Sequence, residues 1–139
     1  MIRVVLDTNV VVSALISPFG NEALVIAAAQ DGRIAPCISR ETLAEYAEVL
    51  ARPKFGFAEN EIEGLIGLLQ SRGIPLEPKP VTGASPDPSD DIFVACALAA
   101  EAEFLVTGNK RHFPDESYGR AKVVSARELL EAINTPRFW

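Results

Sequence analysis

The chain has 139 residues, of which 48% are hydrophobic and 23% are charged, and its formal net charge is −6 at pH 7. This length suits one domain around one core, so we expect residues 1–139 to form a single domain. The negative charge argues against a general nucleic-acid binder that works through a basic surface. It does not exclude a nuclease, because a carboxylate cluster that holds metal ions itself contributes negative charge.

The apolar residues are spread along the chain, and no run has the length of a membrane span. The apolar residues 2–6 end at Asp7, whereas a secretory signal needs a longer apolar stretch and a small-residue cleavage site. We therefore expect a cytoplasmic protein that does not contact a membrane. Cys37 and Cys96 each lie in an apolar segment without a nearby histidine or second cysteine. We interpret them as buried small hydrophobic residues, not as zinc ligands or a disulfide.

Short β-branched segments alternate with helical patterns along the chain. The expected strands are residues 2–6, 33–38, 103–107 and 121–124. The expected helices are residues 9–16, 21–30, 39–51, 59–72, 89–102 and 125–133. Ser39 is suited to cap the helix that it opens, and Gly73 is placed to end the helix 59–72. Ser125 and Glu128 form a capping-box pattern.

The alternation of strands and helices predicts the fold class. Parallel neighbouring strands need crossover connections, so we expect an α/β protein, a three-layer α/β/α sandwich with a mainly parallel central sheet. Functional sites in such folds lie at the carboxyl ends of the strands. Residues 75–88 carry five prolines, and we expect a surface connection there with a short extended piece.

Asp7 directly follows the first expected strand, in the run Leu-Asp-Thr-Asn-Val-Val. Thr8 and Asn9 add oxygen-bearing side chains at the start of the next helix, at the edge where open α/β sheets keep their sites. The structural alternative is that Asp7 or Asn9 only caps this helix. Carboxylates so close to a core strand are seldom left without a partner, which favours a functional role for Asp7.

The expected helix 39–51 carries three acids, Glu41, Glu45 and Glu48. At roughly 100° per residue, Glu45 lies closest to the border of the apolar stripe, and the other two point further towards water. Glu45 is therefore the acid best placed to face the sheet edge. A glutamate on an amphipathic helix is usually only solvated, so this placement alone favours a structural interpretation.

Ser89, Asp90 and Asp91 lie in the first turn of a strongly apolar expected helix. Acids at that position cap free N–H groups and match the helix dipole. Capping accounts for one aspartate, and the second is left free to face a site. The sequence does not decide which of the two is free.

The loop after the strand 103–107 is polar. Thr107 and Asn109 offer oxygen atoms, and Lys110, Arg111 and His112 form the densest basic patch of the chain. Each of these residues alone is compatible with a solvated turn. His112 has no serine or cysteine in a nucleophile context beside it, so we interpret it as structural.

These four groups fall at strand ends or helix starts on what should be one edge of the sheet. Hard oxygen ligands in such numbers suit Mg²⁺ or Mn²⁺ better than zinc. Such ions lower the pKa of a bound water and stabilise the charge of a phosphodiester during in-line displacement. The candidates to hold the phosphate backbone are Lys110, Arg111, Arg52 and Lys54.

Four motifs occur in a characteristic order: Leu-Asp-Thr-Asn-Val, Ser-x-x-x-Leu-x-Glu, Asp-Pro-x-Asp-Asp and Val-Thr-Gly-Asn-Lys-x-x-Phe. This order resembles the PIN-domain family, and most closely its branch of toxins from prokaryotic toxin–antitoxin pairs. The resemblance covers roughly residues 2–133. It implies a parallel-sheet α/β/α sandwich and a metal-dependent ribonuclease that cuts single-stranded RNA.

The resemblance also implies roles for individual residues. The family's first acid corresponds to Asp7, the second to Glu45, and the third to either Asp90 or Asp91, all as catalytic metal ligands. The positions that support the metal or its ligands are Thr8, Asn9 and Thr107. In the toxin branch the resemblance further implies a cognate antitoxin that covers the site, and frequent homodimers. The aromatic C-terminus, residues 136–139, packs either in such an interface or back onto the domain.

The fourth acidic position of the family, often aspartate, is Asn109 here. An amide binds a cation less strongly than a carboxylate does, which leaves open whether one or two metals bind. Asp115 compensates only if its loop folds back. Asn109 also motivates an alternative: a catalytically weak or inactive module that binds RNA or a protein partner. A dehalogenase-like phosphatase ranks low, because its second aspartate would stand where this chain has Asn9.

Overall fold

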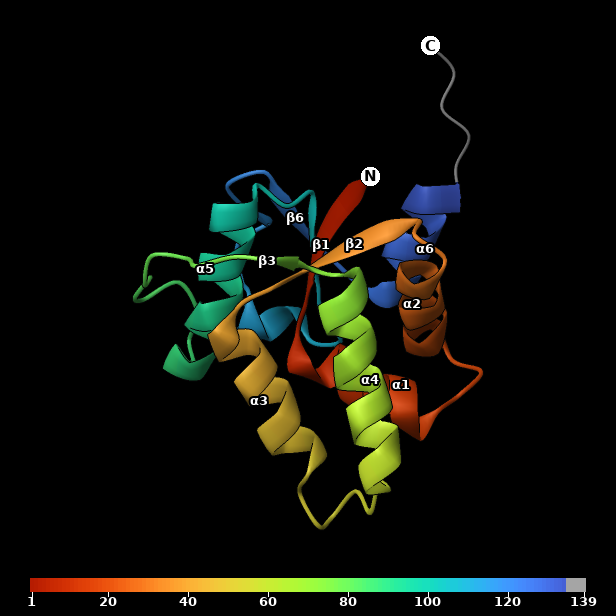
Figure 1. Ribbon diagram of the computed structural model, residues 1–139. Coiled ribbons are helices and arrows are strands. Elements are labelled where there is room, and N and C mark those ends of the chain that lie inside the picture. Colours follow the sequence, from red (N-terminus) through yellow and green to blue (C-terminus); the bar gives the residue numbers. More distant parts are fainter. Residues whose placement is uncertain (135–139) are drawn as a thin grey trace.

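The computed structural model describes residues 1–134 (Figure 1), so the C-terminal residues 136–139 lie outside the described part. The strands are β1 (Ile2–Leu6), β2 (Ile34–Ile38), β3 (Ile74–Pro75), β4 (Phe104–Val106), β5 (Ser117–Tyr118) and β6 (Ala121–Val124). The helices are α1 (Thr8–Ile16), α2 (Asn21–Gln30), α3 (Arg40–Leu50), α4 (Glu59–Arg72), α5 (Asp91–Ala100) and α6 (Ala126–Asn134), with 3₁₀ turns η1 (Pro88–Asp90) and η2 (Lys110–His112).

The strands form one sheet in the order β3-β2-β1-β4-β6-β5, and every pair is parallel except β5 with β6. Figure 1 shows α5 on one side of the sheet and α2 and α6 on the other. This arrangement confirms the predicted three-layer α/β/α fold with a mainly parallel sheet. The chain leaves β1 towards β2 and later returns as β4 on the other side of β1. The carboxyl ends of β1 and β4 therefore flank the point where the strand order reverses, which is where such folds bind ligands.

The core lies on both faces of the central strands. Val4 and Val5 of β1 have no exposed surface, and α5 packs against β1, β2 and β4. Burial on nearly all sides explains why α5 is apolar almost throughout instead of showing one apolar stripe. Cys37 and Cys96 are buried and free, which confirms their predicted role as core residues.

The helix ends follow the capping signals of the sequence. The Ser39 hydroxyl accepts a hydrogen bond from the Thr42 N–H at 3.1 Å. Ser125 and Glu128 form the predicted capping box, with 3.1 Å from Glu128 N to Ser125 Oγ and 2.8 Å from Ser125 N to Glu128 Oε1. These bonds satisfy backbone groups that have no partner within the helix.

Gly73 ends α4 as predicted, but the reason is a close backbone approach. Its backbone is extended, with φ −85° and ψ 163°. A Cβ atom there would lie 2.2 Å from the Leu69 carbonyl oxygen and 2.9 Å from that of Pro36. Only glycine therefore lets the end of α4 pack this closely against β2.

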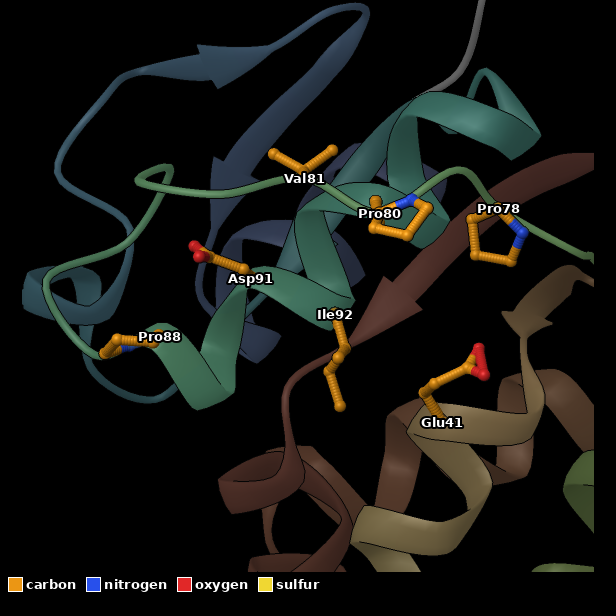
Figure 2. A pocket seen from close by; sticks show the side chains of 8 residues that line it. Glu41, Pro78, Pro80, Val81, Pro88, Asp91 and Ile92 are labelled. Atoms are coloured by element: carbon orange, nitrogen blue, oxygen red, sulfur yellow. The ribbon is translucent and has the colours of Figure 1, made fainter.

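One predicted helix differs in the structure, and the proline-rich connection has the short extended piece that was expected. The expected helix 89–102 begins as the 3₁₀ turn η1 and ends at Ala100, because Glu101 takes the left-handed conformation with φ 50°. The proline-rich connection starts with the end of the two-residue strand β3. It then passes over α5, where Pro78, Pro80 and Val81 line a hollow of about 270 Å³ (Figure 2).

Within residues 1–134, no single helix has the length and apolar composition needed to cross a membrane. Helices α1 and α2 satisfy those two criteria only as a pair, and the pair is bent by 102°.

Candidate active site

Asp7 lies at the carboxyl end of β1, is 2% exposed, and gives its two oxygens to different partners. Oδ1 accepts a hydrogen bond from the Thr8 N–H at 2.8 Å and so caps α1. Oδ2 accepts one from the Thr107 hydroxyl at 2.8 Å and lies 3.0 Å from His112 Nδ1. Asp7 N also donates to the Val106 carbonyl at 2.8 Å, which joins the ends of β1 and β4. Helix capping thus occupies one oxygen and leaves the other facing the strand-end crevice.

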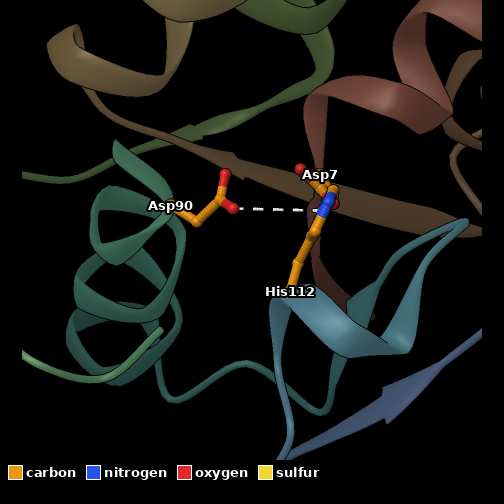
Figure 3. A group of neighbouring side chains, drawn as sticks. All are labelled: Asp7, Asp90 and His112. Carbon is orange, nitrogen blue, oxygen red and sulfur yellow. Dashed lines mark hydrogen bonds and ion pairs between the residues drawn. The ribbon is translucent and has the colours of Figure 1, made fainter. Parts of the chain in front are cut away.

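Asp7, Asp90 and His112 form one cluster (Figure 3). One ligand atom from each residue lies within 4.8 Å of the others, and His112 Nδ1 is 3.9 Å from Asp90 Oδ2. The three side chains come from the end of β1, from η1 and from η2. His112, interpreted from the sequence as structural, is thus brought to the metal-binding candidates. Its place three residues after Asn109, in the same strand-end loop, was the available signal.

The adjacent aspartates Asp90 and Asp91 face different surroundings. The Asp90 side chain is 15% exposed and points towards the cluster. Burial and, next, the negative charge of Asp7 raise the pKa of Asp90 to about 6, against a lowering by His112. Asp91 is 6% exposed, and its carboxylate accepts hydrogen bonds from Ser85 N at 2.8 Å and Gly83 N at 3.1 Å.

The segment held by Asp91 in turn holds η2. The Ser85 hydroxyl donates to the carbonyl of His112 at 2.5 Å, and the Tyr118 hydroxyl donates to the carbonyl of Ala84 at 3.2 Å. Figure 2 shows Asp91 at the start of α5, on the hollow beneath Val81. Asp91 is therefore tied to the backbone that positions His112, whereas Asp90 faces the cluster itself.

Glu45 approaches the cluster from α3. The next residue, Tyr46, fixes this helix, because its hydroxyl donates to the Leu6 carbonyl at 2.5 Å and its ring stacks on Phe93 with 6.0 Å between centroids. Glu45 is half-buried and lines the same cleft as Asp7. Burial, then the charge of Glu48 and, more weakly, that of Asp7, raise the pKa of Glu45.

The cleft around these acids has a volume of about 390 Å³. The predicted site residues that line it are Asp7, Thr8, Asn9, Glu45, Arg52, Lys54 and Asp90. The polar and aromatic lining residues that sequence reasoning did not select for the site are Ser13, Phe55, Asp87, Ser89 and His112. Acids and bases thus share one open cleft at the strand ends.

Besides Asp91 and Asp115, four predicted residues do not line this cleft. Thr107 lies behind Asp7 as its hydrogen-bond donor. The Asn109 side chain accepts a hydrogen bond from Arg111 N at 3.0 Å and so starts η2. Lys110 Nζ pairs with Glu128 Oε1 at 2.7 Å, and Arg111 is exposed on the same turn.

Two further predicted residues occupy distinct places. Asp115 is exposed and lines a separate hollow with Lys110 and Glu128, so its loop does not fold back to the cluster. Asn9 Oδ1 accepts a hydrogen bond from Gly108 N at 2.9 Å, which ties the start of α1 to the loop after β4.

The donor set fits a divalent cation. Asp7 and Asp90 place two carboxylates beside one imidazole, and within residues 1–134 no lysine or arginine forms an ion pair with Asp7, Asp90 or Glu45. In the same described range, Thr8 Oγ1 is the buried side-chain oxygen without a hydrogen-bond partner, and Thr8 lines the cleft. A cation with its water ligands would compensate the clustered charge and supply a partner for this hydroxyl.

Comparison with known protein families agrees with this geometry. A family model described as PIN domain matches residues 3–111, which include Asp7, Glu45 and Asp90 and reach into η2. A search among curated proteins finds no match. PIN domains are generally nucleases, that is hydrolases, and use divalent metals. With the match covering most of its length and the acids gathered at the strand ends, the chain belongs to the PIN domain family.

Proposed function

We propose that this protein is a metal-dependent endoribonuclease that hydrolyses phosphodiester bonds of single-stranded RNA with Mg²⁺ or Mn²⁺. The observation that supports this most is the convergence of Asp7, Glu45 and Asp90 on one cleft where no lysine or arginine of residues 1–134 neutralises them by an ion pair. Such a charge cluster is costly without a cation. Of the two adjacent aspartates we assign Asp90 as the ligand.

Each side chain has a distinct task in this proposal. Asp7 and Asp90 bind the ion, and Thr107 and His112 hold Asp7 Oδ2 in place. A bound divalent ion supplies Lewis-acid stabilisation of the phosphodiester charge and lowers the pKa of water. Glu45, whose raised pKa makes it a stronger base than an ordinary glutamate, accepts a proton from water in the cleft.

The test is cleavage of labelled single-stranded RNA by the purified protein with Mn²⁺ or Mg²⁺, compared with EDTA. Asp7→Asn is the test variant, and Asp115→Asn, an acid in a separate hollow, is the matched control. We expect metal-dependent cutting that Asp7→Asn abolishes and Asp115→Asn retains, with both variants folded by melting temperature. Equal cutting by wild type and Asp7→Asn would identify a contaminant and refute the proposal.

The alternative of an inactive binding module was motivated by Asn109. Its side chain begins η2 and does not line the cleft, which supports a site built from Asp7, Glu45 and Asp90 without Asn109. The same assay decides between the two functions, because an inactive module binds metal or RNA without cutting.

We further propose that the nuclease is the toxin of a cytoplasmic toxin–antitoxin pair, that it forms homodimers, and that its antitoxin covers the cleft. The order of the four sequence motifs supports this role. Expression of the wild type in a bacterial host should arrest growth, and expression of Asp7→Asn should not. Unimpaired growth with a demonstrably active enzyme would contradict the toxin role, and light scattering of the purified protein tests the dimer.

A further inference from the structure

An aromatic and basic segment, residues 52–57, forms part of the wall of the cleft. Arg52, Lys54 and Phe55 line the cleft together with the acids of the cluster. The segment follows α3 directly, so it is connected to the helix that carries Glu45. A ring and two cations therefore stand in the same open space as the candidate metal ligands.

The geometry of Phe55 is defined on two sides. The ring is half-buried and packs against the core, and Phe57 stacks with it at 5.4 Å between centroids and 8° between planes. Lys54 Nζ lies over the Phe55 ring, 5.1 Å from its centroid. Among residues 1–134 no acid forms an ion pair with Lys54, whose side chain is exposed. The ring is thus held in place by packing, and an exposed cation lies over it.

We propose that Phe55 is a stacking platform for an unpaired nucleobase of the RNA whose phosphodiester is held at the metal cluster, an inference that rests on the proposed function. An exposed cation–π contact contributes about 0.5–1 kcal/mol. Stacking of a base on an aromatic side chain contributes about 1–3 kcal/mol. A base therefore replaces the Lys54 ammonium on the ring, and the released ammonium binds the neighbouring phosphate.

This arrangement selects single-stranded substrate. In a duplex the bases are already stacked and paired, so reaching Phe55 would require one to be extruded at a cost of a few kcal/mol. Every base has a π-face, so the platform is tolerant of sequence. Phe55 lines the cleft, and Phe57 does not. A purely structural role for the stacked pair would not require this position of Phe55.

The test measures binding with Ca²⁺ in place of Mg²⁺ or Mn²⁺, so that a divalent cation is available to the cluster, and a gel checks that the RNA stays uncut. The probes are a fluorescein-labelled single-stranded RNA, the same chain with abasic sites, and a duplex. Phe55→Ala should weaken binding of the single strand by about 5- to 150-fold, the factor that corresponds to one lost stacking contact. It should leave binding of the abasic chain unchanged. The control is Phe19→Ala, at a phenylalanine that is 97% exposed and outside the cleft.

Phe55→Trp should retain the affinity, and its added indole fluorescence should be quenched by the single strand. Lys54→Gln should keep the preference for bases over abasic chain but reduce the slope of log affinity against log salt by about 0.7. Equal affinity of wild type and folded Phe55→Ala, or equal binding of normal and abasic chains by the wild type, would overturn the platform. Failure of the proposed function shows itself differently, as absence of metal-dependent cutting by the wild type.

Discussion

One wall of the cleft is held by buried and partly buried hydrogen bonds, and the other is held by aromatic packing. On the first, Asp91 binds the 83–85 backbone, Ser85 binds η2, and Thr107 and His112 hold Asp7. On the second, the residues 52–57 stack two phenyl rings and leave their cations exposed. Metal ligands need fixed positions, which a satisfied polar network provides. A flexible RNA strand is bound better by exposed cationic side chains, which can change conformation, beside an aromatic ring that is fixed by packing.

Substitutions in the first wall should lower the unfolding free energy more than substitutions in the second. Asp91→Ala leaves the N–H groups of Gly83 and Ser85 without their charged acceptor, so we expect a loss of about 3 kcal/mol of unfolding free energy. Urea denaturation measures this loss. Asp115→Ala, at an exposed acid, should stay within about 0.5 kcal/mol of the wild type. Equal stability of the two variants would mean that the Asp91 contacts do not hold this wall.

The next largest effect concerns His112, which contacts Asp7 directly. Loss of the group that orients a metal ligand lowers metal affinity about 10- to 100-fold, and we expect this for His112→Ala with Mn²⁺ in calorimetric titration. Arg111→Ala changes the neighbouring residue of the same turn, which does not line the cleft. It should bind Mn²⁺ as the wild type does, and a similar loss in both variants would place the cause in η2 as a whole.

The third prediction concerns the pH dependence of stability. The pKa of Asp90 is raised from 3.8 to about 6 in the folded protein, so between these values the folded state retains a proton that the unfolded state has released. Stability from this group is therefore greatest below its unfolded pKa and falls as the pH rises to about 6.

Asp90→Asn removes that loss. At pH 7 and without metal, the variant should be more stable than the wild type by about 1 kcal/mol, after allowance for solvent screening. It should also lose most of the rise in melting temperature that Mn²⁺ gives the wild type. Melting temperatures in EDTA, measured between pH 3.8 and pH 7, test the first effect. If the melting temperatures of the two proteins changed with pH in the same way, folding would not raise the pKa of Asp90.

The smallest expected effects are changes in RNA affinity when a cation of either wall, Arg52 or Lys110, is removed. Arg52 lines the cleft but pairs with Glu48 at 3.1 Å, so Arg52→Gln should weaken RNA binding only about twofold to threefold. Lys110→Gln breaks an exposed pair with Glu128 outside the cleft and should leave RNA affinity unchanged. Anisotropy titrations distinguish them, and a larger loss for Lys110→Gln would show that RNA follows the η2 side.

The periodicity of the sequence was sufficient to predict the layers of the fold, because strands and helices of several turns are determined by local pattern. The two-residue strands β3 and β5 depend on their partners in the sheet and leave no alternation to recognise. The start of α5 was predicted as regular helix, whereas η1 precedes it, and the Asp91 carboxylate there binds the backbone of the nearby 83–85 segment.

The candidate site was predicted where one residue's position follows from its own element. Asp7 ends a buried strand, and Glu45 borders an apolar stripe. For the basic loop, residues 110–112, the sequence did not show which side chain faces the site and which faces away from it. With 3.0 residues per turn, η2 points Lys110 and His112 in different directions, one towards Glu128 and the other towards Asp7. A reading of composition alone treats them as one patch.

The residues that hold Asp7 lie far from it in the order of synthesis. Thr107 and His112 follow it by 100 and 105 residues. At about 5–20 residues per second, translation needs about 5 to 20 seconds to cover that interval. For the ribonuclease proposed here, the nascent chain has no assembled centre until Thr107 and His112 have been made, so the growing chain cannot cut RNA during that interval.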